Sequence, residues 1–208
     1  LAESEKELGL NITDGQIAEM KKFQNDINYD DAHKFEREVR HDVMAHVKAF
    51  GKQAKSAEPI IHLGATSCYV TDNAEVIIID DALNIVLKKL VNVMDKLKKF
   101  ALQYKSVPTL GFTHLQPAQL TTVGKRATLW LSDLEMDYID LMHLKNTVKL
   151  RGVKGTTGTQ ASFLDLFNGD GEKVKELEKK VVAKLGYSKV YGVTGQTYPR
   201  KFDYNVLC

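Results

Sequence analysis

The sequence predicts an all-α fold in which an N-terminal helical domain is followed by long antiparallel helices of a central bundle. Glycine and proline, which interrupt helices, are few: the 208 residues include 14 glycines and 4 prolines. Residues 71–107 contain neither of them. Apolar residues recur at three- and four-residue steps through most of the chain, and this spacing places them on one face of a helix.

The first strongly periodic segment covers residues 31–50 and predicts one helix that ends at Gly51. Its apolar face comprises Ala32, Phe35, Val39, Val43, Val47 and Phe50. His46 lies one heptad from Val39, so packing in a core or an interface is expected for it. The consecutive residues Arg40, His41 and Asp42 are expected on the exposed arc of this helix.

Residues 71–107 predict a long helix with Thr71 or Asp72 as its N-cap. Its expected seam alternates steps of three and four over four heptads: Val76, Ile79, Leu83, Val86, Leu90, Val93, Leu97, Phe100 and Tyr104. A second apolar set falls outside that seam: Ile78, Ile85, Val91 and Met94. A helix with two apolar faces needs neighbours on two sides, in a bundle interior or an oligomer contact.

A second long helix is expected at residues 118–150, antiparallel to the first, and little convincing strand is expected anywhere. A loop rich in glycine and threonine follows at residues 152–160, then a charged helix near 171–185. We expect an N-terminal domain at residues 1–66 and the first part of the bundle domain at 67–208. Because the chain opens without methionine inside a helical pattern, we expect a truncated form of a longer protein.

The composition disfavours several classes of function. Lysine and arginine number 29 against 27 aspartates and glutamates, so no strong overall charge would attract nucleic acid. The two cysteines, Cys68 and Cys208, form no disulfide framework or metal-binding spacing, which favours a reducing, cytoplasmic setting. The longest apolar run, residues 76–79, is too short for a membrane span. No metal or cofactor is expected.

His114 is the first candidate for chemistry, because imidazole can donate a proton near neutral pH. It lies in the segment Thr-His-Leu-Gln-Pro at residues 113–117, between the two expected long helices. A helix N-terminus there could direct its amide groups toward an anion. The alternative is a loop histidine that ties down Pro117. His62 follows the apolar pair Ile60-Ile61 and is expected to be either packed or solvated.

The residues Arg40, His41 and Asp42 combine a cation, a titratable ring and a carboxylate. A solvated charged helix face is the alternative reading. Hydroxyl groups of Thr66 and Ser67, and of the threonines at positions 156–159, are suited to hold carboxylate or phosphate oxygens. The glycine loop is not a Walker motif, because no Gly-Lys-Ser/Thr follows it at the required spacing.

Together these segments resemble the fumarase/aspartase superfamily and, within it, the animal-type adenylosuccinate lyase family. The resemblance covers essentially the whole chain. It rests on five motifs in order: Arg-His-Asp-Val-Met-Ala-His at 40–46, Ile-His-Leu-Gly-Ala-Thr-Ser-Cys-Tyr-Val at 61–70, Thr-Leu-Gly-Phe-Thr-His-Leu-Gln-Pro-Ala-Gln at 109–119, residues 151–163, and Thr-Gly-Gln-Thr-Tyr at 194–198.

The resemblance implies a fumarase/aspartase-like fold and a lyase that acts on a purine nucleotide without a cofactor. Such enzymes cleave adenylosuccinate to AMP and fumarate, and release fumarate from the succinylocarboxamide intermediate of purine synthesis. His114 matches the general acid that protonates the departing nitrogen, and His41 is also implicated in activity. The matching substrate contacts are Arg40, His41, Asp42, Thr66, Ser67, Thr113 and Gln196.

The resemblance also implies a homo-oligomer, expected to be a tetramer, whose active sites are shared between subunits. The base of the family, a serine in the pattern Gly-Ser-Ser-x-Met-Pro-x-Lys-x-Asn-Pro, has no counterpart in these 208 residues. We therefore expect the chain alone to be inactive. Two alternatives remain at this point: another fumarate-releasing lyase of the superfamily, and a non-catalytic helical bundle.

Overall fold

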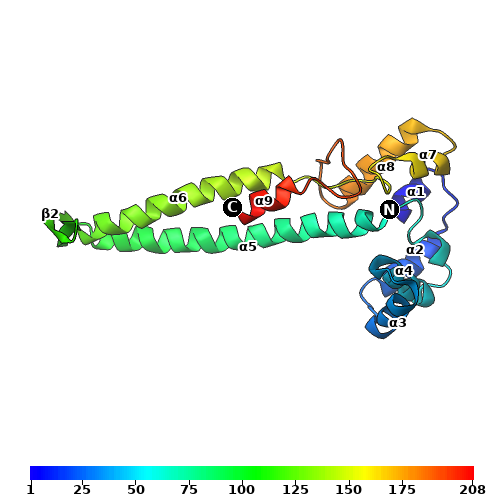
Figure 1. Cartoon of the computed structure of the whole chain (residues 1–208), viewed down its shortest axis with the longest axis horizontal. Coiled ribbons are helices and arrows are strands. Elements are labelled where there is room, and N and C mark those ends of the chain that lie inside the picture. The colour runs from blue at the N-terminus through cyan, green and yellow to red at the C-terminus, as the bar shows by residue number, and fades with distance from the viewer. The chain divides into compact units, whose positions relative to one another are not determined.

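The computed structural model describes all residues from 1 to 208, and helices dominate it (Figure 1). The α-helices are α1 (Ala2–Glu7), α2 (Asp14–Phe23), α3 (Tyr29–Val39), α4 (Asp42–Gln53), α5 (Ser67–Gln103), α6 (Val123–Thr147), α7 (Ala161–Leu166), α8 (Gly171–Lys184) and α9 (Lys201–Leu207). A short 3-10 helix, η1 (Glu58–Ile60), precedes α5, and two strands, β1 (Pro108–Thr113) and β2 (Gln116–Thr122), form one antiparallel hairpin. The predicted all-α class is confirmed, with this hairpin as an unexpected addition.

The chain divides into two compact units. The first unit contains Leu1–Ile77 together with Lys149–Cys208, and the second contains Ile78–Val148. None of the helices is both long enough and apolar enough to span a membrane.

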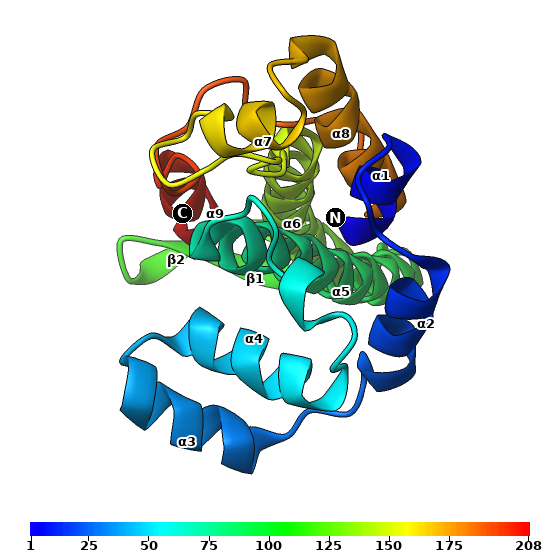
Figure 2. The ribbon, with the colours of Figure 1, turned by 90° about the vertical axis from the view of Figure 1, so that its right-hand side faces the viewer.

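The core of the first unit forms where amphipathic helices bury one face. On α8, apolar residues at helical spacing (Val174, Leu177 and Val181) pack against Phe163 of α7, with α1 beside them (Figure 2). A neighbouring cluster joins α1 and α2 to the segment that contains η1. Figure 2 also shows α3 and α4 side by side, as their contacts require.

The single helix predicted at residues 31–50 is wrong, because two helices replace it. Arg40 adopts a left-handed backbone with φ 55°, and this conformation ends α3. His41 is extended and caps the start of α4. The apolar spacing continues through the break, and no glycine or proline marks it. Periodicity alone therefore could not locate this corner.

In the second unit, α6 runs antiparallel to the part of α5 that follows Ile77 (Figure 1). The ammonium group of Lys145 donates to Asp80 at 2.8 Å near one end of the pair. At the other end, Gly124 lies so close to the backbone of Ala101 that a Cβ there would overlap its carbonyl oxygen. The expected antiparallel helix pair is therefore present.

The seam of this pair differs by one residue from the predicted one at several positions. Leu87 and Ala101 are buried, whereas the predicted Val86, Val93 and Phe100 are exposed. Steps of three then four, or of four then three, both connect Leu83 to Leu90, so the heptad pattern fits either set. Packing against α6 selects the steps of four then three, which pass through Leu87.

The boundaries of both long helices also differ from those predicted. α5 covers Ser67–Gln103 rather than residues 71–107. α6 begins at Val123 rather than at 118. Thr122 caps this start, because its hydroxyl oxygen accepts from the amide of Lys125 at 3.1 Å. Residues 118–122 belong instead to β2, which pairs with β1.

Glu5 on α1 is fully buried, and neither of its carboxylate oxygens has a hydrogen-bond partner within the chain. Burial raises the pKa of Glu5 to about 7, because a low-polarity environment disfavours the charged form. Glu7 on the same helix is paired with Lys184 and Lys180, and these ammonium groups lower its pKa to about 2.

Only Glu5 should make stability depend on pH between pH 5 and pH 8, because Glu7 is ionised in both the folded and the unfolded chain throughout that window. The unfolded chain ionises Glu5 near pH 4.5, whereas the folded chain keeps the proton until about pH 7, so folding loses about 3 kcal/mol across that window. Glu5→Gln should remove this loss, and Glu7→Gln should leave it unchanged. Urea unfolding at pH 5 and pH 8 measures both effects. Equal pH dependence in wild type and Glu5→Gln would contradict the prediction.

Candidate functional site

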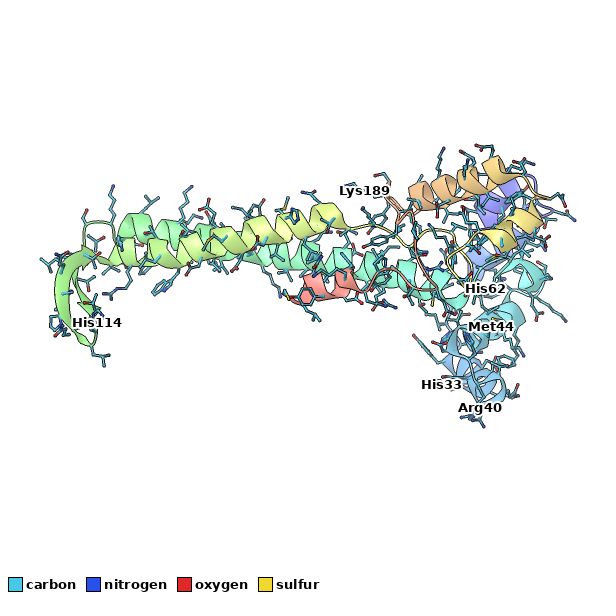
Figure 3. The ribbon with its side chains drawn as sticks, turned by 45° about the horizontal axis from the view of Figure 1, so that its top comes forward. His33, Arg40, Met44, His62, His114 and Lys189 are labelled. Atoms are coloured by element: carbon cyan, nitrogen blue, oxygen red, sulfur yellow. The ribbon has the colours of Figure 1, made fainter.

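The corner between α3 and α4 presents Arg40, which Figure 3 labels, followed in the chain by His41 and Asp42. Nδ1 of His41 lies 3.4 Å from the amide of Met44, from which it accepts, and 3.3 Å from Oδ1 of Asp42. These two contacts use the same nitrogen, so the first requires Nδ1 without a hydrogen and the second requires Nδ1 to carry one. With Nδ1 engaged, Nε2 is the nitrogen that can meet a ligand.

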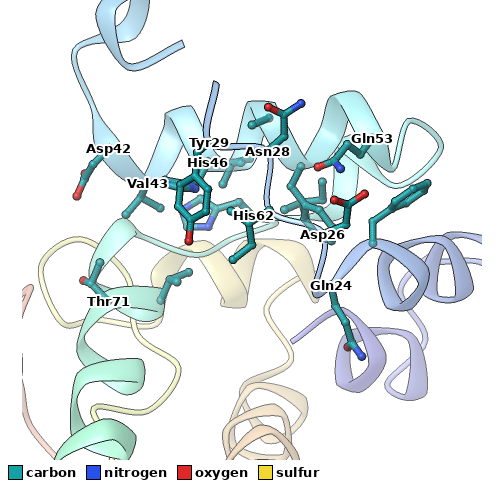
Figure 4. Close-up of a pocket in the computed structure, with 17 residues that line it drawn as sticks. Gln24, Asp26, Asn28, Tyr29, Asp42, Val43, His46, Gln53, His62 and Thr71 are labelled. Carbon is teal, nitrogen blue, oxygen red and sulfur yellow. The ribbon is translucent and has the colours of Figure 1, made fainter. Parts of the chain in front are cut away.

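A cavity of about 550 Å³ adjoins this corner, between α4, the connection from α2 to α3, and the first turn of α5. Figure 4 shows Tyr29, His46 and His62 close together on its wall. Burial lowers the pKa of His62, and the nearby His41 lowers it further. His46 is exposed and lines the cavity, so it does not belong to the core of this chain. No lysine or arginine lines the cavity.

Thr66 and Ser67 lie where α5 begins. Thr66 is buried, and its carbonyl accepts from the amide of Tyr69. The first amide groups of a helix have no partner within the helix, so they can bind an anion together with nearby hydroxyl groups. This arrangement fits the predicted role of Thr66 and Ser67 in holding carboxylate oxygens, which stays a prediction.

The loop rich in glycine and threonine lies beside this helix start. The hydroxyl group of Ser162 donates to the carbonyl of Gly64 at 2.7 Å and links the end of the loop to the segment before α5. The side-chain amide of Asn73 in α5 donates to the carbonyl of Gly152 at 3.2 Å, and its oxygen accepts from the amide of Gly152 at 3.0 Å. The loop is therefore attached to the first turns of α5.

Gln196 belongs to a segment that the same loop supports. Nε of Arg151 donates to the carbonyl of Gln196 at 2.7 Å, and the amide of Tyr198 donates to Asp72 at 2.7 Å. The structure thus brings together the start of α5, the loop and the segment that carries Gln196. Sequence reasoning did not single out Arg151, although a basic residue directly before a glycine-rich loop was a usable signal.

Thr113 and His114 belong to the second unit, at the turn of the β1–β2 hairpin (Figure 3). Thr113 pairs with Gln116, and both intervening residues have positive φ, 51° at His114 and 63° at Leu115. Positive φ at both central residues is the requirement of a type I′ turn, which usually takes Asn-Gly. The turn exposes His114 and leaves Leu115 fully accessible to solvent.

This hairpin corrects the expected surroundings of His114. A helix N-terminus was predicted next to it, but α6 begins only at Val123, after β2. The amide groups near His114 are those of a strained turn, and no helix end directs them. The histidine is therefore held by hairpin geometry, which fixes the backbone on both sides of it.

Gly158 gives a test of how the loop and the Gln196 segment fit together. Gly158 has φ +80°, and a Cβ there would overlap the carbonyl oxygen of Thr194, whereas Gly169 has φ +85° and open space around it. Gly169→Ala should cost about 1–2 kcal/mol for the backbone conformation alone, and Gly158→Ala should cost clearly more. Thermal or urea unfolding of both variants measures the difference. Equal losses would show that the loop and the segment do not pack as described.

Comparison with known proteins identifies the family. A family described as lyase matches residues 4–203. The chain is 56% identical to adenylosuccinate lyase of Saccharomyces cerevisiae over 211 residues, and 54% identical to adenylosuccinate lyase of Schizosaccharomyces pombe over 210 residues. Each match covers 100% of this chain and 44% of the relative, so the chain spans less than half the length of these relatives.

The fold is also similar to that of solved structures. A fumarate lyase from Mesorhizobium sp. BNC1 superposes with a TM-score of 0.79 at 24% identity, covering 93% of this chain and 44% of that protein. This likeness confirms the predicted fumarase/aspartase-like architecture. Because the family match extends over almost all of its residues, the chain belongs to the lyase family.

Proposed function

We propose that the protein to which this chain belongs cleaves adenylosuccinate to AMP and fumarate, and releases fumarate from the succinylocarboxamide intermediate of purine synthesis. The names of the yeast relatives support the substrate. The observation that carries the chemistry is the exposed His114, which a strained two-residue turn fixes at the end of a hairpin.

The reaction is an anti β-elimination, in which a base removes a proton from the carbon beside a carboxylate. The carbon–nitrogen bond then breaks, its electron pair stays on nitrogen, and the protonated imidazole of His114 gives its proton to that nitrogen. Thr66, Ser67 and Thr113 hold carboxylate oxygens, and developing negative charge there is stabilised by hydroxyl and amide donors. The base comes from a serine loop that these residues do not include.

Arg40, His41, Asp42 and Gln196 contact the nucleotide in this proposal. Their surroundings support it, because His41 presents one free ring nitrogen at a corner beside the cavity of about 550 Å³. His41 takes part in proton transfer together with His114. No metal or cofactor takes part in the proposed reaction.

Oligomerisation belongs to the same proposal. The second unit exposes many large apolar side chains along its two helices: Ile78, Ile85, Val86, Val91, Val93, Phe100 and Leu102 on α5, and Leu129, Trp130, Met136 and Ile139 on α6. Apolar exposure on this scale marks an interaction surface. We propose a cytoplasmic homotetramer in which subunits share active sites. Within each chain we propose a domain boundary at residue 66, directly before α5 begins.

The general-acid role of His114 is tested in the full-length protein. His114→Ala should lower kcat for adenylosuccinate by about 10²- to 10⁴-fold, because proton donation to the leaving nitrogen is lost. His143→Ala, which removes an exposed histidine of α6, is the matched control and should leave kcat unchanged. Fumarate absorbance measures turnover, and light scattering verifies that assembly persists. Unchanged turnover in His114→Ala would refute the assignment.

The 208-residue chain by itself should release no measurable fumarate from adenylosuccinate. The reason is that it contains no Gly-Ser-Ser-x-Met-Pro segment to supply the base. The same absorbance assay, with the full-length protein as positive control, measures this. Fumarate release by the purified 208-residue chain would show that another group in these residues acts as the base.

A further inference from the structure

Arg151 is the largest of the fully buried side chains, with 0% of its surface exposed. It donates three hydrogen bonds, and all three go to backbone carbonyl groups. Nη1 donates to Lys154 at 2.7 Å, Nη2 to Gly155 at 2.8 Å, and Nε to Gln196 at 2.7 Å. One guanidinium group thus joins the loop after α6 to a segment more than 40 residues further along the chain.

The segment that carries Gln196 is held from a second direction. Asp72, which is only 2% exposed, accepts from the amide of Tyr198 two residues beyond Gln196. Gly158 of the loop lies against the backbone of Thr194 and Gly195 on the other side. The backbone around Gln196 is therefore fixed on both sides, while its own side chain stays exposed.

The chemistry of arginine suits this role better than that of lysine or an apolar residue. The guanidinium group is planar and directs its donors along fixed directions, whereas an ammonium group is a compact point charge. Burial lowers the pKa of Arg151, although Asp72, Cys68 and Glu178 oppose this shift. Burying a charge is costly, and an apolar residue of similar volume often stabilises a protein equally well. The arginine additionally fixes the position of the loop relative to the segment that carries Gln196.

We propose that Arg151 is a positioning residue that sets how Gln196 meets the substrate. The inference rests on the proposed function, because Gln196 is a substrate contact only in that proposal. Arg151 itself touches no reacting atom, and its effect passes through the backbone of residue 196.

The test is a double-mutant cycle in the full-length protein with adenylosuccinate. Arg151→Lys keeps the charge, but its single nitrogen cannot reach three carbonyl groups that are placed for Nε, Nη1 and Nη2, so kcat/KM should fall about 10- to 100-fold, as for a displaced contact group. In a Gln196→Ala background the same change should have almost no further effect, because coupled residues are not additive. Asn73→Ala is the matched control, since Asn73 holds the same loop through Gly152. Its effect should be the same in both backgrounds.

Amide hydrogen exchange gives a readout that does not depend on turnover. Arg151→Lys should speed exchange at Tyr198 while the amides of α8 remain protected, and Asn73→Ala should leave Tyr198 protected. If Arg151→Lys fails to fold, Asp72→Asn takes its place, because it weakens the other attachment of the segment while keeping an acceptor oxygen. That variant should show the same dependence on Gln196.

The outcomes separate the two proposals. Unchanged kcat/KM in Arg151→Lys, or an equal loss with and without Gln196, would overturn the positioning role even if wild type cleaves adenylosuccinate. Unchanged exchange at Tyr198 would overturn it as well. Failure of the wild-type protein to cleave adenylosuccinate would refute the proposed function alone, and the exchange result would still decide whether Arg151 positions the segment.

Discussion

Three backbone carbonyl groups from two separate segments converge on the buried guanidinium group of Arg151. The segments after α6 and after α8 contain little regular structure, so their buried carbonyl groups cannot be satisfied within a helix or a sheet. A buried carbonyl without a partner costs about 1–3 kcal/mol. Arg151 supplies these donors, and Lys154 adds a bond to the carbonyl of Arg151 and an ion pair with Glu178. The loops of the first unit depend on this network.

The second unit depends on a different interaction. Its two helices share a narrow apolar seam that buries Leu83, Leu87, Ala127 and Leu144, whereas many other large apolar residues of the pair remain exposed. A helix that is apolar on more than one face belongs inside a bundle, where each face meets another helix. The first unit thus holds its loops together through buried polar contacts, whereas the second unit presents apolar surfaces suited to further helices.

The sequence predicted the helical class and the main elements because apolar periodicity reports burial directly. It failed where burial does not determine the backbone. The corner at Arg40 interrupts a pattern whose apolar spacing continues unbroken, and the hairpin at His114 lacks the Asn-Gly pair that signals such a turn. For the candidate site, the sequence named residues by resemblance. It could not show that Arg151 and Asp72 hold the backbone around Gln196, because those contacts join distant segments.

The corner at Arg40 and the hairpin at His114, which the sequence did not predict, share a physical property. Only four residues other than glycine have positive φ: Arg40, His114, Leu115 and Asn168. Three of these four lie at the two corners that carry the candidate histidines His41 and His114. A left-handed backbone costs a non-glycine residue about 1–2 kcal/mol, and such strain persists only where the surrounding structure imposes it. At His114 the hairpin imposes it, and a glycine in the turn would relieve it. The strain therefore gives support, independent of any resemblance, for placing the chemistry at these two corners.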